Sequence, residues 1–289
     1  MASVSQWVAA ARLRTLPMAI APVIVGSAAA AQLGEFHLAK ALLALVVALA
    51  LQIGVNYSND YSDGIRGTDD QRVGPFRMTG SAAAAPKTVR NMAFTFFGIA
   101  ALAGLGLVIW SQQWWLLAVG VAAIIAAWFY TGGKKPYGYL GLGEVFVFVF
   151  FGLVAVLGTT YTQADTVSGL AWAGAIGTGL VSTALLMANN VRDLPTDAEA
   201  GKMTLAVRLG DTAARWSYPI MLTVAVAAPL FFIRQYPTMA GMLVLLVISI
   251  RPSILMIEAK DRNELIPVLK MTGLFSILYA LLFTVGVIL

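Results

Sequence analysis

The sequence predicts an all-α integral membrane protein, built as a bundle of nine transmembrane helices. Of its 289 residues, 59% are hydrophobic and only 11% are charged, whereas a soluble domain carries roughly 25% charged residues. Nine mostly apolar stretches each approach the length of about 20 residues that a helix needs to cross a bilayer. The basic residues fall almost entirely in every second connection between these stretches, as expected for spans that alternate in direction.

The nine expected spans follow one another without a region of soluble-domain composition between them. Arg12 and Arg14 precede the first span, which lacks a processing site, so we interpret it as a helix that stays in the membrane. We therefore expect a single transmembrane domain over residues 1–289. The spans cover residues 15–33, 41–58, 91–110, 114–131, 143–163, 167–188, 216–234, 238–256 and 267–288.

The distribution of charges predicts the orientation of the bundle. Only Lys40 and Arg234 of the 19 basic residues, and only Glu35 and Asp165 of the 14 acidic residues, fall outside the segments on the side of the N-terminus. The positive-inside rule places that side in the cytoplasm. We expect a multi-pass protein of the cell membrane whose active site lies on the cytoplasmic face. The net charge of +5 is modest, so we expect the lipid bilayer as a partner and no nucleic acid.

The residue types present exclude several chemistries. The chain has no cysteine and a single histidine, His37, on a short outer connection. Disulfides, Cys-zinc sites and thiol catalysis are therefore excluded. Because His37 is the only histidine, His-pair metal sites and Ser-His-Asp triads are excluded as well. Acidic, amide and basic side chains are left to carry any chemistry.

A first polar cluster lies where the second span reaches the cytoplasm. If the helix continues there, Asn56, Asn59, Asp60 and Asp63 share one face, because steps of three and four residues complete about one turn. Two carboxamides and two carboxylates would then form one stripe at the membrane edge.

A second polar cluster lies at the corresponding end of the sixth span. Asn190, Asp193 and Asp197 also share a face if helical geometry persists. Asn189 precedes Asp193 by four residues, as an asparagine precedes the first aspartate of the other cluster, and both helices point the same way. We interpret this as a weak internal repeat that brings two acidic helix ends together.

Two converging acidic helix ends favour a metal site. Carboxylates repel one another unless a cation lies between them, and Mg²⁺ is usually held by one or two carboxylates together with substrate phosphates. Basic residues on the same side would neutralise a bound diphosphate. In the alternative reading, the acidic residues cap helix ends and the basic residues only mark topology. The candidate diphosphate-binding residues are Arg66, Arg77, Lys134, Lys135, Arg192 and Lys202.

Four segments carry a family pattern in a fixed order. They are Asn59–Asp63, Tyr130–Glu144, Asn189–Asp193 with Asp197, and Lys202–Gly210. Together they resemble the UbiA superfamily of intramembrane aromatic prenyltransferases, and the resemblance extends over nearly the whole chain. It implies a UbiA-type bundle of nine helices with a central cavity that opens to the cytoplasmic face.

The resemblance also implies a chemistry. Two Mg²⁺ ions would bridge the diphosphate of a polyprenyl donor, with both clusters as metal ligands and Asp60, Asp63, Asp193 and Asp197 as catalytic residues. Within the superfamily the chain is most similar to the branch of menaquinone biosynthesis. That branch transfers a polyprenyl group from polyprenyl diphosphate to 1,4-dihydroxy-2-naphthoate with loss of CO2 and diphosphate, giving demethylmenaquinol.

One position departs from the superfamily. Gly67 stands where a third aspartate is often found, and Asp69 follows it, a pattern similar to the naphthoate branch. The role of Asp69 as a metal ligand is left open.

The aromatic acceptor needs residues of its own, and alternatives remain for the substrate. Arg14 is a candidate for holding the acceptor carboxylate, and Tyr130, Tyr137 and Glu144 are candidates for orienting or deprotonating its hydroxyl. A 4-hydroxybenzoate or homogentisate prenyltransferase of the same superfamily is the first alternative. A divalent-cation transporter is the second, but it would need ionisable residues near the bilayer midplane, whereas the aspartates here gather at one face.

Overall fold

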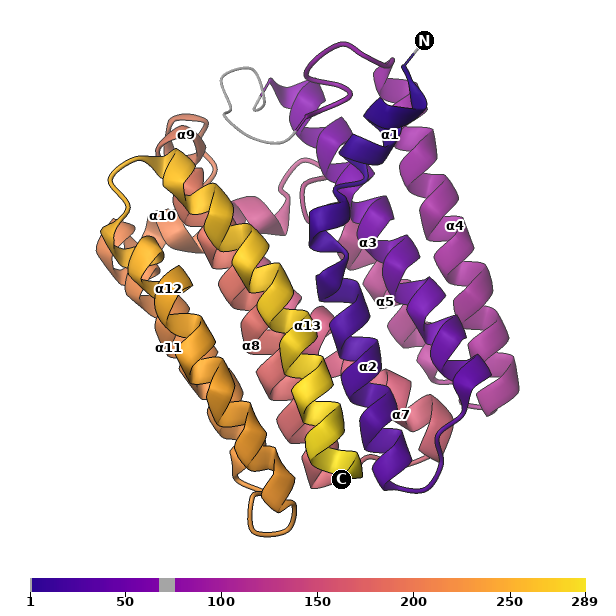
Figure 1. The fold of residues 1–289 in the computed structure, drawn as a ribbon. Coiled ribbons are helices and arrows are strands. Elements are labelled where there is room, and N and C mark those ends of the chain that lie inside the picture. The colour runs from indigo at the N-terminus through magenta and orange to yellow at the C-terminus, as the bar shows by residue number, and fades with distance from the viewer. Residues whose placement is uncertain (1, 68–75) are drawn as a thin grey trace.

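A computed structural model describes residues 2–67 and 76–289. Within these ranges the secondary structure is helical and contains no strand. Figure 1 shows long helices that run side by side between the two ends of the molecule. The predicted all-α bundle is therefore confirmed.

The N-terminal half of the chain supplies helices α1 to α5. A 3-10 turn at Leu13–Thr15 leads into α2 at Pro17, and proline is tolerated there because the first turn of a helix leaves its N–H groups unpaired. The helix that carries the first polar cluster, α3, ends at Gly67 in the left-handed conformation with φ 73°, which glycine adopts at little cost. The bounds are α1 Val4–Ala10, α2 Pro17–Gln32, α3 Leu38–Arg66, α4 Pro86–Ser111 and α5 Leu116–Phe129.

The C-terminal half supplies helices α6 to α13. A π-helical segment, Phe148–Val154, joins α6 and α7 into one continuous span. The bounds are α6 Gly143–Val147, α7 Ala155–Ala164, α8 Gly169–Arg192, α9 Leu194–Glu199, α10 Leu205–Leu209, α11 Asp211–Leu230, α12 Val244–Glu258 and α13 Ile266–Ile288. Three 3-10 turns lie at Tyr137–Leu140, Pro237–Leu243 and Arg262–Leu265.

Helices occupy all nine predicted positions, but fewer of them have the length and composition of a span. Six of the described helices qualify, and a seventh is formed if α1 and α2, which bend by 49°, count as one span. α5 has only 14 residues, about 21 Å of helix, against a hydrocarbon core of about 30 Å. α11 begins with polar turns around Asp211 and Arg215, which lower its hydropathy.

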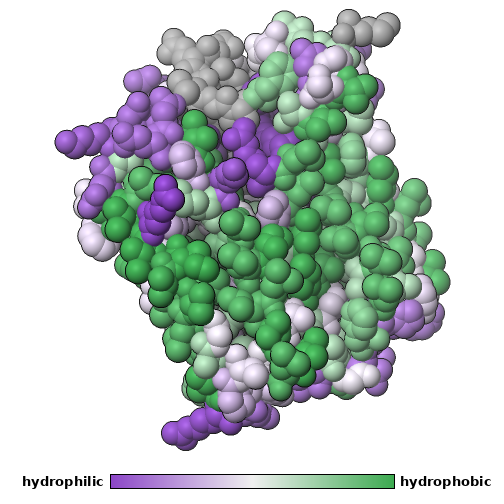
Figure 2. Space-filling model, in the orientation of Figure 1, coloured by the Kyte–Doolittle hydropathy of each residue, from purple (hydrophilic) through white to green (hydrophobic). Residues whose placement is uncertain are grey.

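The surface carries a broad apolar band between two polar ends. Figure 2 shows hydrophobic residues covering the middle of the molecule and hydrophilic ones gathered toward its ends. Large apolar side chains such as Leu102, Val247 and Leu274 are more than half exposed, at 73%, 69% and 61%. Soluble monomers rarely expose apolar patches of this size, so the band indicates a multi-pass membrane protein.

The two helices that carry the polar clusters pack closely against their neighbours at glycines. Most of the apolar window of α8, 72% of it, is buried, and a Cβ added to Gly152 would lie 2.5 Å from the Cα of Gly179 on α8. On the other side, Gly54 of α3 lies against the ring of Phe97 on α4. Close packing through glycine thus fixes α8 and α3, whose C-terminal ends lie toward the N-terminal end of the molecule (Figure 1).

Candidate active site

The first polar cluster lies on one continuous helix, as the spacing predicts. α3 runs through to Arg66 without a break. All four polar residues of the cluster are buried, because they face neighbouring helices and loops rather than bulk solvent. They are Asn56, Asn59, Asp60 and Asp63.

Asp60 anchors a loop. Its Oδ2 accepts a hydrogen bond from the backbone N–H of Met78 at 2.7 Å, and its Oδ1 accepts one from the N–H of Thr79 at 2.9 Å. Gly64, one turn further along α3, has no side chain to obstruct Thr79, whose Cγ2 would lie 2.4 Å from an added Cβ. The carboxylate and the glycine together seat the loop against α3 and so position Arg77.

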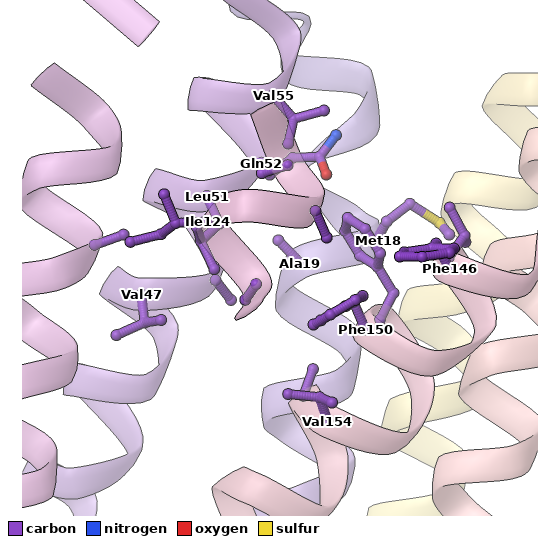
Figure 3. A pocket seen from close by; sticks show the side chains of 18 of the residues that line it. Met18, Ala19, Val47, Leu51, Gln52, Val55, Ile124, Phe146, Phe150 and Val154 are labelled. Carbon is purple, nitrogen blue, oxygen red and sulfur yellow. The ribbon is translucent and has the colours of Figure 1, made fainter. Parts of the chain in front are cut away.

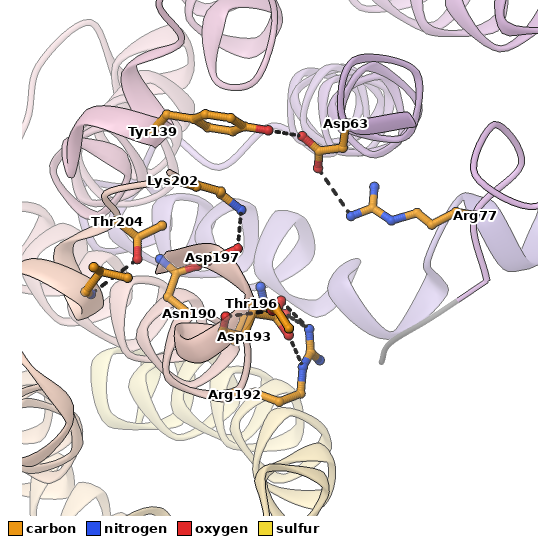
Figure 4. A network of polar contacts seen from close by, with 12 residues as sticks. Asp63, Arg77, Tyr139, Asn190, Arg192, Asp193, Thr196, Asp197, Lys202 and Thr204 are labelled. Carbon is orange, nitrogen blue, oxygen red and sulfur yellow. Dashed lines mark hydrogen bonds and ion pairs between the residues drawn. The ribbon is translucent and has the colours of Figure 1, made fainter. Parts of the chain in front are cut away.

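Asp63 contacts Arg77, which this loop carries. Its Oδ2 lies 3.5 Å from the Nη2 of Arg77, and its Oδ1 accepts a hydrogen bond from the hydroxyl of Tyr139 at 2.8 Å (Figure 4). Asp63 is therefore a buried carboxylate with a cation and a phenol beside it.

The second polar cluster does not lie on one continuous helix. α8 ends at Arg192, Asp193 has φ −90° and ψ 1°, and α9 begins at Leu194. Pro195 explains the break, because proline fits the first turn of a new helix but cannot continue the hydrogen bonding of the old one. The shared helical face expected for Asn190, Asp193 and Asp197 is therefore interrupted.

Both aspartates of the second cluster are paired with basic residues. The guanidinium of Arg192 donates to both oxygens of Asp193, at 2.7 and 2.8 Å, and to the Oδ1 of Asn189 at 2.8 Å. The Nζ of Lys202 lies 3.2 Å from the Oδ1 of Asp197. These four charged side chains are almost completely buried.

The two clusters meet through Tyr139 and Lys202. The hydroxyl of Tyr139 donates to Asp63, while the Nζ of Lys202 lies 5.4 Å from the centre of the Tyr139 ring and pairs with Asp197 (Figure 4). One chain of contacts thus joins the end of α3 to α9. The structure brings together the two acidic helix ends that the repeated spacing predicted would converge.

A cavity of about 440 Å³ opens beside this junction. One end is polar, and the rest is lined mostly by apolar side chains of α2 to α8, with Phe146, Phe150, Leu51 and Val47 among them (Figure 3). Thr159 and Thr162 of α7 also line it. The residues at its polar end are Arg12, Thr15, Gln52, Asn56, Asn59, Asp63, Arg77, Tyr130, Tyr137, Asn189, Asn190 and Lys202.

The cavity separates the predicted site residues into two groups. Eight of the predicted site residues line this cavity, and the other nine lie outside its lining. Among these, Arg14 and Arg192 line a smaller cavity of about 50 Å³ that shares Arg12, Thr15 and Asn189 with the large one. The remaining residues outside the large cavity are Asp60, Asp193, Asp197, Arg66, Lys134, Lys135 and Glu144.

Several of these outer residues support the loop between α5 and α6. Arg66 donates to the backbone carbonyls of Thr131 and Gly133, and its guanidinium lies 5.3 Å from the centre of the Tyr139 ring. Lys134 and Lys135 are exposed at the tip of the loop. In this structure the three cations hold or flank the loop rather than face the cavity.

The predicted acceptor-binding residues also have contacts of their own. Glu144 is buried, and its Oε1 accepts a hydrogen bond from the Nδ2 of Asn190 at 2.8 Å. The hydroxyl of Tyr137 donates to the carbonyl of Ala126 at 2.9 Å, and burial raises the pKa of this phenol. Tyr137 therefore stays protonated at neutral pH and cannot act there as a base.

Sequence reasoning missed two residues at the polar end. Tyr139 is not among the predicted site residues, although it contacts Asp63 directly. Arg12, which has φ 55° and lines both cavities, was interpreted only as a topology signal. Tyr139 lies between the two basic residues of its loop and Glu144, and this proximity was the signal available. Asp69 lies outside the described residues.

The donor atoms at the polar end suit magnesium together with a diphosphate. Among the residues that the structure describes, no three acidic or histidine side chains form a ready-made metal cluster. Mg²⁺ needs no such cluster, because phosphates and water complete its shell. Asp63 supplies a carboxylate, and Asn59, whose Oδ1 accepts from Thr131 at 2.8 Å, and Asn190 supply carboxamide oxygens beside it.

Comparisons with known proteins give the family. Residues 19–288 match the UbiA prenyltransferase family. A 1,4-dihydroxy-2-naphthoate octaprenyltransferase of Mycobacterium tuberculosis is 53% identical over 281 residues, which are 97% of this chain and 96% of that protein. The protein of the same name from Escherichia coli is 36% identical over 292 residues, covering 98% of this chain and 95% of the relative.

Solved structures share the fold at low sequence identity. The apo structure of a UbiA homolog from Aeropyrum pernix K1 has a TM-score of 0.71 at 15% identity and covers 96% of this chain and 98% of that one. A UbiA homolog from Archaeoglobus fulgidus bound to DMAPP and Mg²⁺ has a TM-score of 0.64 at 14% identity, covering 96% and 99%. Motifs, fold and relatives agree, and the chain belongs to the UbiA prenyltransferase family.

Proposed function

We propose that this protein transfers a polyprenyl group from polyprenyl diphosphate to 1,4-dihydroxy-2-naphthoate, in the biosynthesis of menaquinone. The observation that carries the proposal is the cavity, which is polar at one end and mostly apolar over the rest of its length. A polyprenyl diphosphate has the same division between a charged head and an apolar tail. The acceptor is inferred from the relatives, which are named for 1,4-dihydroxy-2-naphthoate at 53% and 36% identity.

The apolar part of the cavity would hold the donor's tail and keep water from the reacting carbon. Its walls come from α2 to α8, and the π-helical segment contributes Phe150, Phe151 and Val154. An allylic cation reacts with water, so exclusion of water protects it until the acceptor attacks. A path for divalent cations would instead need polar groups along this stretch.

The polar end would hold the diphosphate. We assign metal binding to Asp63 and Asp197, assisted by the amide oxygens of Asn59 and Asn190; two Mg²⁺ ions would bridge the diphosphate there. The ions would supply Lewis-acid charge to the leaving group. Support for the metal comes from the family, since a UbiA homolog was solved with DMAPP and Mg²⁺.

Arg77 and Lys202 would take the remaining negative charge of the diphosphate. Both line the cavity and both contact an aspartate of the metal-binding pair. Their charges are fixed in place before the reaction, which is the arrangement that lowers a barrier when charge develops on a leaving oxygen. Asp60 and Asp193 would act indirectly, by holding the loop of Arg77 and the side chain of Arg192.

The bonds that change are then defined. The allylic C–O bond of the donor breaks, and its electron pair leaves with the diphosphate. A ring carbon of the electron-rich naphthoate supplies the pair for the new C–C bond, and loss of the carboxylate as CO2 restores the aromatic ring. The product is demethylmenaquinol. Among the predicted acceptor residues, Tyr130 and Tyr137 line the cavity, and we assign them to its aromatic wall.

We further propose that the chain is one domain with nine membrane-crossing segments, in the cell membrane, with the polar end at the cytoplasmic face. The support is the charge distribution, because all basic residues but Lys40 and Arg234 belong to the segments at the end where the site lies. The short α5 would cross with little tilt, and the bilayer would thin around it.

The experiment is an acceptor panel with purified protein. We expect prenylated product and released CO2 with 1,4-dihydroxy-2-naphthoate, and little product with 4-hydroxybenzoate or homogentisate. Transfer to 4-hydroxybenzoate without transfer to the naphthoate would overturn the substrate assignment. Absence of any prenyl transfer, with Mg²⁺-dependent ion flux into vesicles instead, would overturn the enzyme assignment.

A further inference from the structure

A glutamine lies in the wall of the cavity where its polar end gives way to the apolar part. Gln52 is on α3, one turn before Asn56, and only 7% of it is exposed. Figure 3 shows its carboxamide among the apolar side chains of Met18, Ala19 and Leu51. A buried amide in apolar surroundings calls for partners for both its nitrogen and its oxygen.

Thr15 fixes which way this amide faces. The hydroxyl of Thr15 donates its one hydrogen to the carbonyl of Arg12 at 2.9 Å. It accepts from the Nε2 of Gln52 at 2.9 Å and from the Nδ2 of Asn56 at 3.1 Å. A hydroxyl has one hydrogen and two acceptor positions, so Thr15 is saturated. With that hydrogen given to Arg12, Thr15 accepts from Gln52, and the nitrogen of Gln52 faces it.

The oxygen of Gln52 is therefore presented away from Thr15. Its Oε1 is buried and has no hydrogen-bond partner among the residues that the structure describes. An unpaired buried acceptor carries a desolvation cost that a bound donor group would relieve. Met18, beside it in the cavity wall, has a flexible side chain that adapts to a ligand.

The chemistry of the two substrates indicates which of them would donate a hydrogen bond to the Oε1 of Gln52. The polyprenyl tail has no polar hydrogen, and both the diphosphate and the carboxylate of the acceptor are anions that offer only acceptors. The hydroxyls of the dihydroxynaphthoate are the donor groups that remain. The position of Gln52 agrees with a hydroxyl of the acceptor as its partner. Gln52 lies about 6 Å along the helix axis from Asn56 and about 16 Å from Asp63. This distance leaves room for an aromatic ring between Gln52 and the diphosphate.

We propose that Gln52 is an acceptor-binding residue, whose Oε1 receives a hydrogen bond from a hydroxyl of the aromatic substrate. Phe146 and Phe150, whose rings stack with centres 6.1 Å apart and line the same cavity, give a flat aromatic wall for that substrate. This inference rests on the proposed function, and it adds a determinant of acceptor specificity that none of the Asn/Asp motifs contains.

The test is the variant Gln52→Met, which keeps the length of the side chain and removes the acceptor. We expect the KM for 1,4-dihydroxy-2-naphthoate to rise about tenfold, the loss of one buried hydrogen bond. The KM for the polyprenyl diphosphate and kcat should stay within about twofold, because the bond is made equally in the ground and transition states. Gln32→Met is the matched control, since Gln32 also has a buried, unpartnered Oε1 but lies outside the cavity.

Two substrate analogues sharpen the test. 1-Hydroxy-2-naphthoate and 4-hydroxy-2-naphthoate each lack one hydroxyl and can be measured as competitive inhibitors of the acceptor. The analogue that lacks the hydroxyl facing Gln52 should inhibit the wild type and Gln52→Met equally, while the other should lose about tenfold in the variant.

Three outcomes would overturn the inference. One is an unchanged acceptor KM in Gln52→Met, which would leave a buried water as the partner of Oε1. Another is an equal loss for both analogues, and a third is a rise confined to the KM of the diphosphate. These outcomes differ from failure of the proposed function, in which the wild type itself would not prenylate the naphthoate.

Discussion

The ends of α3 and α8 carry the same four-residue spacing from an asparagine to an aspartate, yet the chain continues differently after each. α3 runs on as a helix to Arg66, whereas α8 stops at Arg192 and α9 starts after Asp193. In both places the first aspartate has both of its carboxylate oxygens occupied by hydrogen bonds. Asp60 accepts from two backbone amides, and Asp193 accepts from both arms of Arg192.

The second aspartate of each cluster is engaged differently from the first. Asp63 reaches Tyr139 and Arg77, and Asp197 reaches Lys202, which also lies over the Tyr139 ring. We infer a division of labour, in which Asp60 and Asp193 build the site and Asp63 and Asp197 bind the metal and diphosphate. The comparison shows that residues of one type in one motif separate into roles by the partners that the fold gives them.

The largest effect should come from the metal-binding pair. Asp63→Asn or Asp197→Asn should lower kcat about 10²- to 10³-fold, because a neutral amide binds Mg²⁺ poorly and the leaving group loses its charge stabilisation. Turnover of purified protein over a Mg²⁺ titration measures this. Asp165→Asn, a matched change at the opposite end of the molecule where Asp165 accepts from Gln113, should leave turnover unchanged. Wild-type turnover in Asp63→Asn or Asp197→Asn would contradict the assignment of metal binding to that aspartate.

The next effect should be on stability. Arg192→Met leaves the carboxylate of Asp193 buried without its forked partner, and we expect a loss of about 3 kcal/mol, seen as a lower melting temperature in detergent. Arg234→Met, at an exposed arginine, is the control. Adding Asp193→Asn to Arg192→Met should recover part of the loss. An unaltered melting temperature would mean that Arg192 is not structural.

A smaller loss is expected at the other site-building aspartate. Asp60→Asn replaces a carboxylate that accepts two backbone hydrogen bonds with an amide whose single oxygen replaces only one of the two acceptors. We expect the free energy of unfolding to fall by about 2 kcal/mol. The loop around Met78 and Thr79 should then become sensitive to protease before the rest of the chain. If the loop stays protected while Mg²⁺ affinity falls, Asp60 belongs with the metal ligands instead.

The smallest effect should be at the residue that joins the two clusters. Tyr139→Phe keeps the ring beneath Lys202 and Arg66 and removes the hydroxyl that donates to Asp63. We expect kcat/KM for the polyprenyl diphosphate to fall about fivefold, the value of one hydrogen bond. A loss as large as that of Asp63→Asn would give the hydroxyl a direct catalytic part.

The sequence predicted the parts of this site that depend on helical periodicity. Asn56, Asn59, Asp60 and Asp63 lie along one helix because steps of three and four residues return to one face. Motifs in order along the chain were enough to predict the family. The meeting of the two clusters also followed from their spacing on helices that point the same way.

The roles of individual residues depended on contacts between distant segments, which periodicity does not contain. The backbone amides that occupy Asp60 come from a loop 18 residues away, and Arg66 binds carbonyls of a loop 65 and 67 residues away. Nothing local to either residue distinguishes these partners from a metal or a phosphate. Hydropathy also located α5 but did not predict its length of only 14 residues.

The most direct test of the division of labour is binding of a non-reacting donor, a polyprenyl S-thiolodiphosphate, measured by calorimetry with and without Mg²⁺. We predict that Asp63→Asn weakens the Mg²⁺-dependent binding about 100-fold or more, and that Asp60→Asn, compared at a temperature where both variants are folded, weakens it less than about tenfold. Equal losses in the two variants, or wild-type binding by Asp63→Asn, would contradict the account.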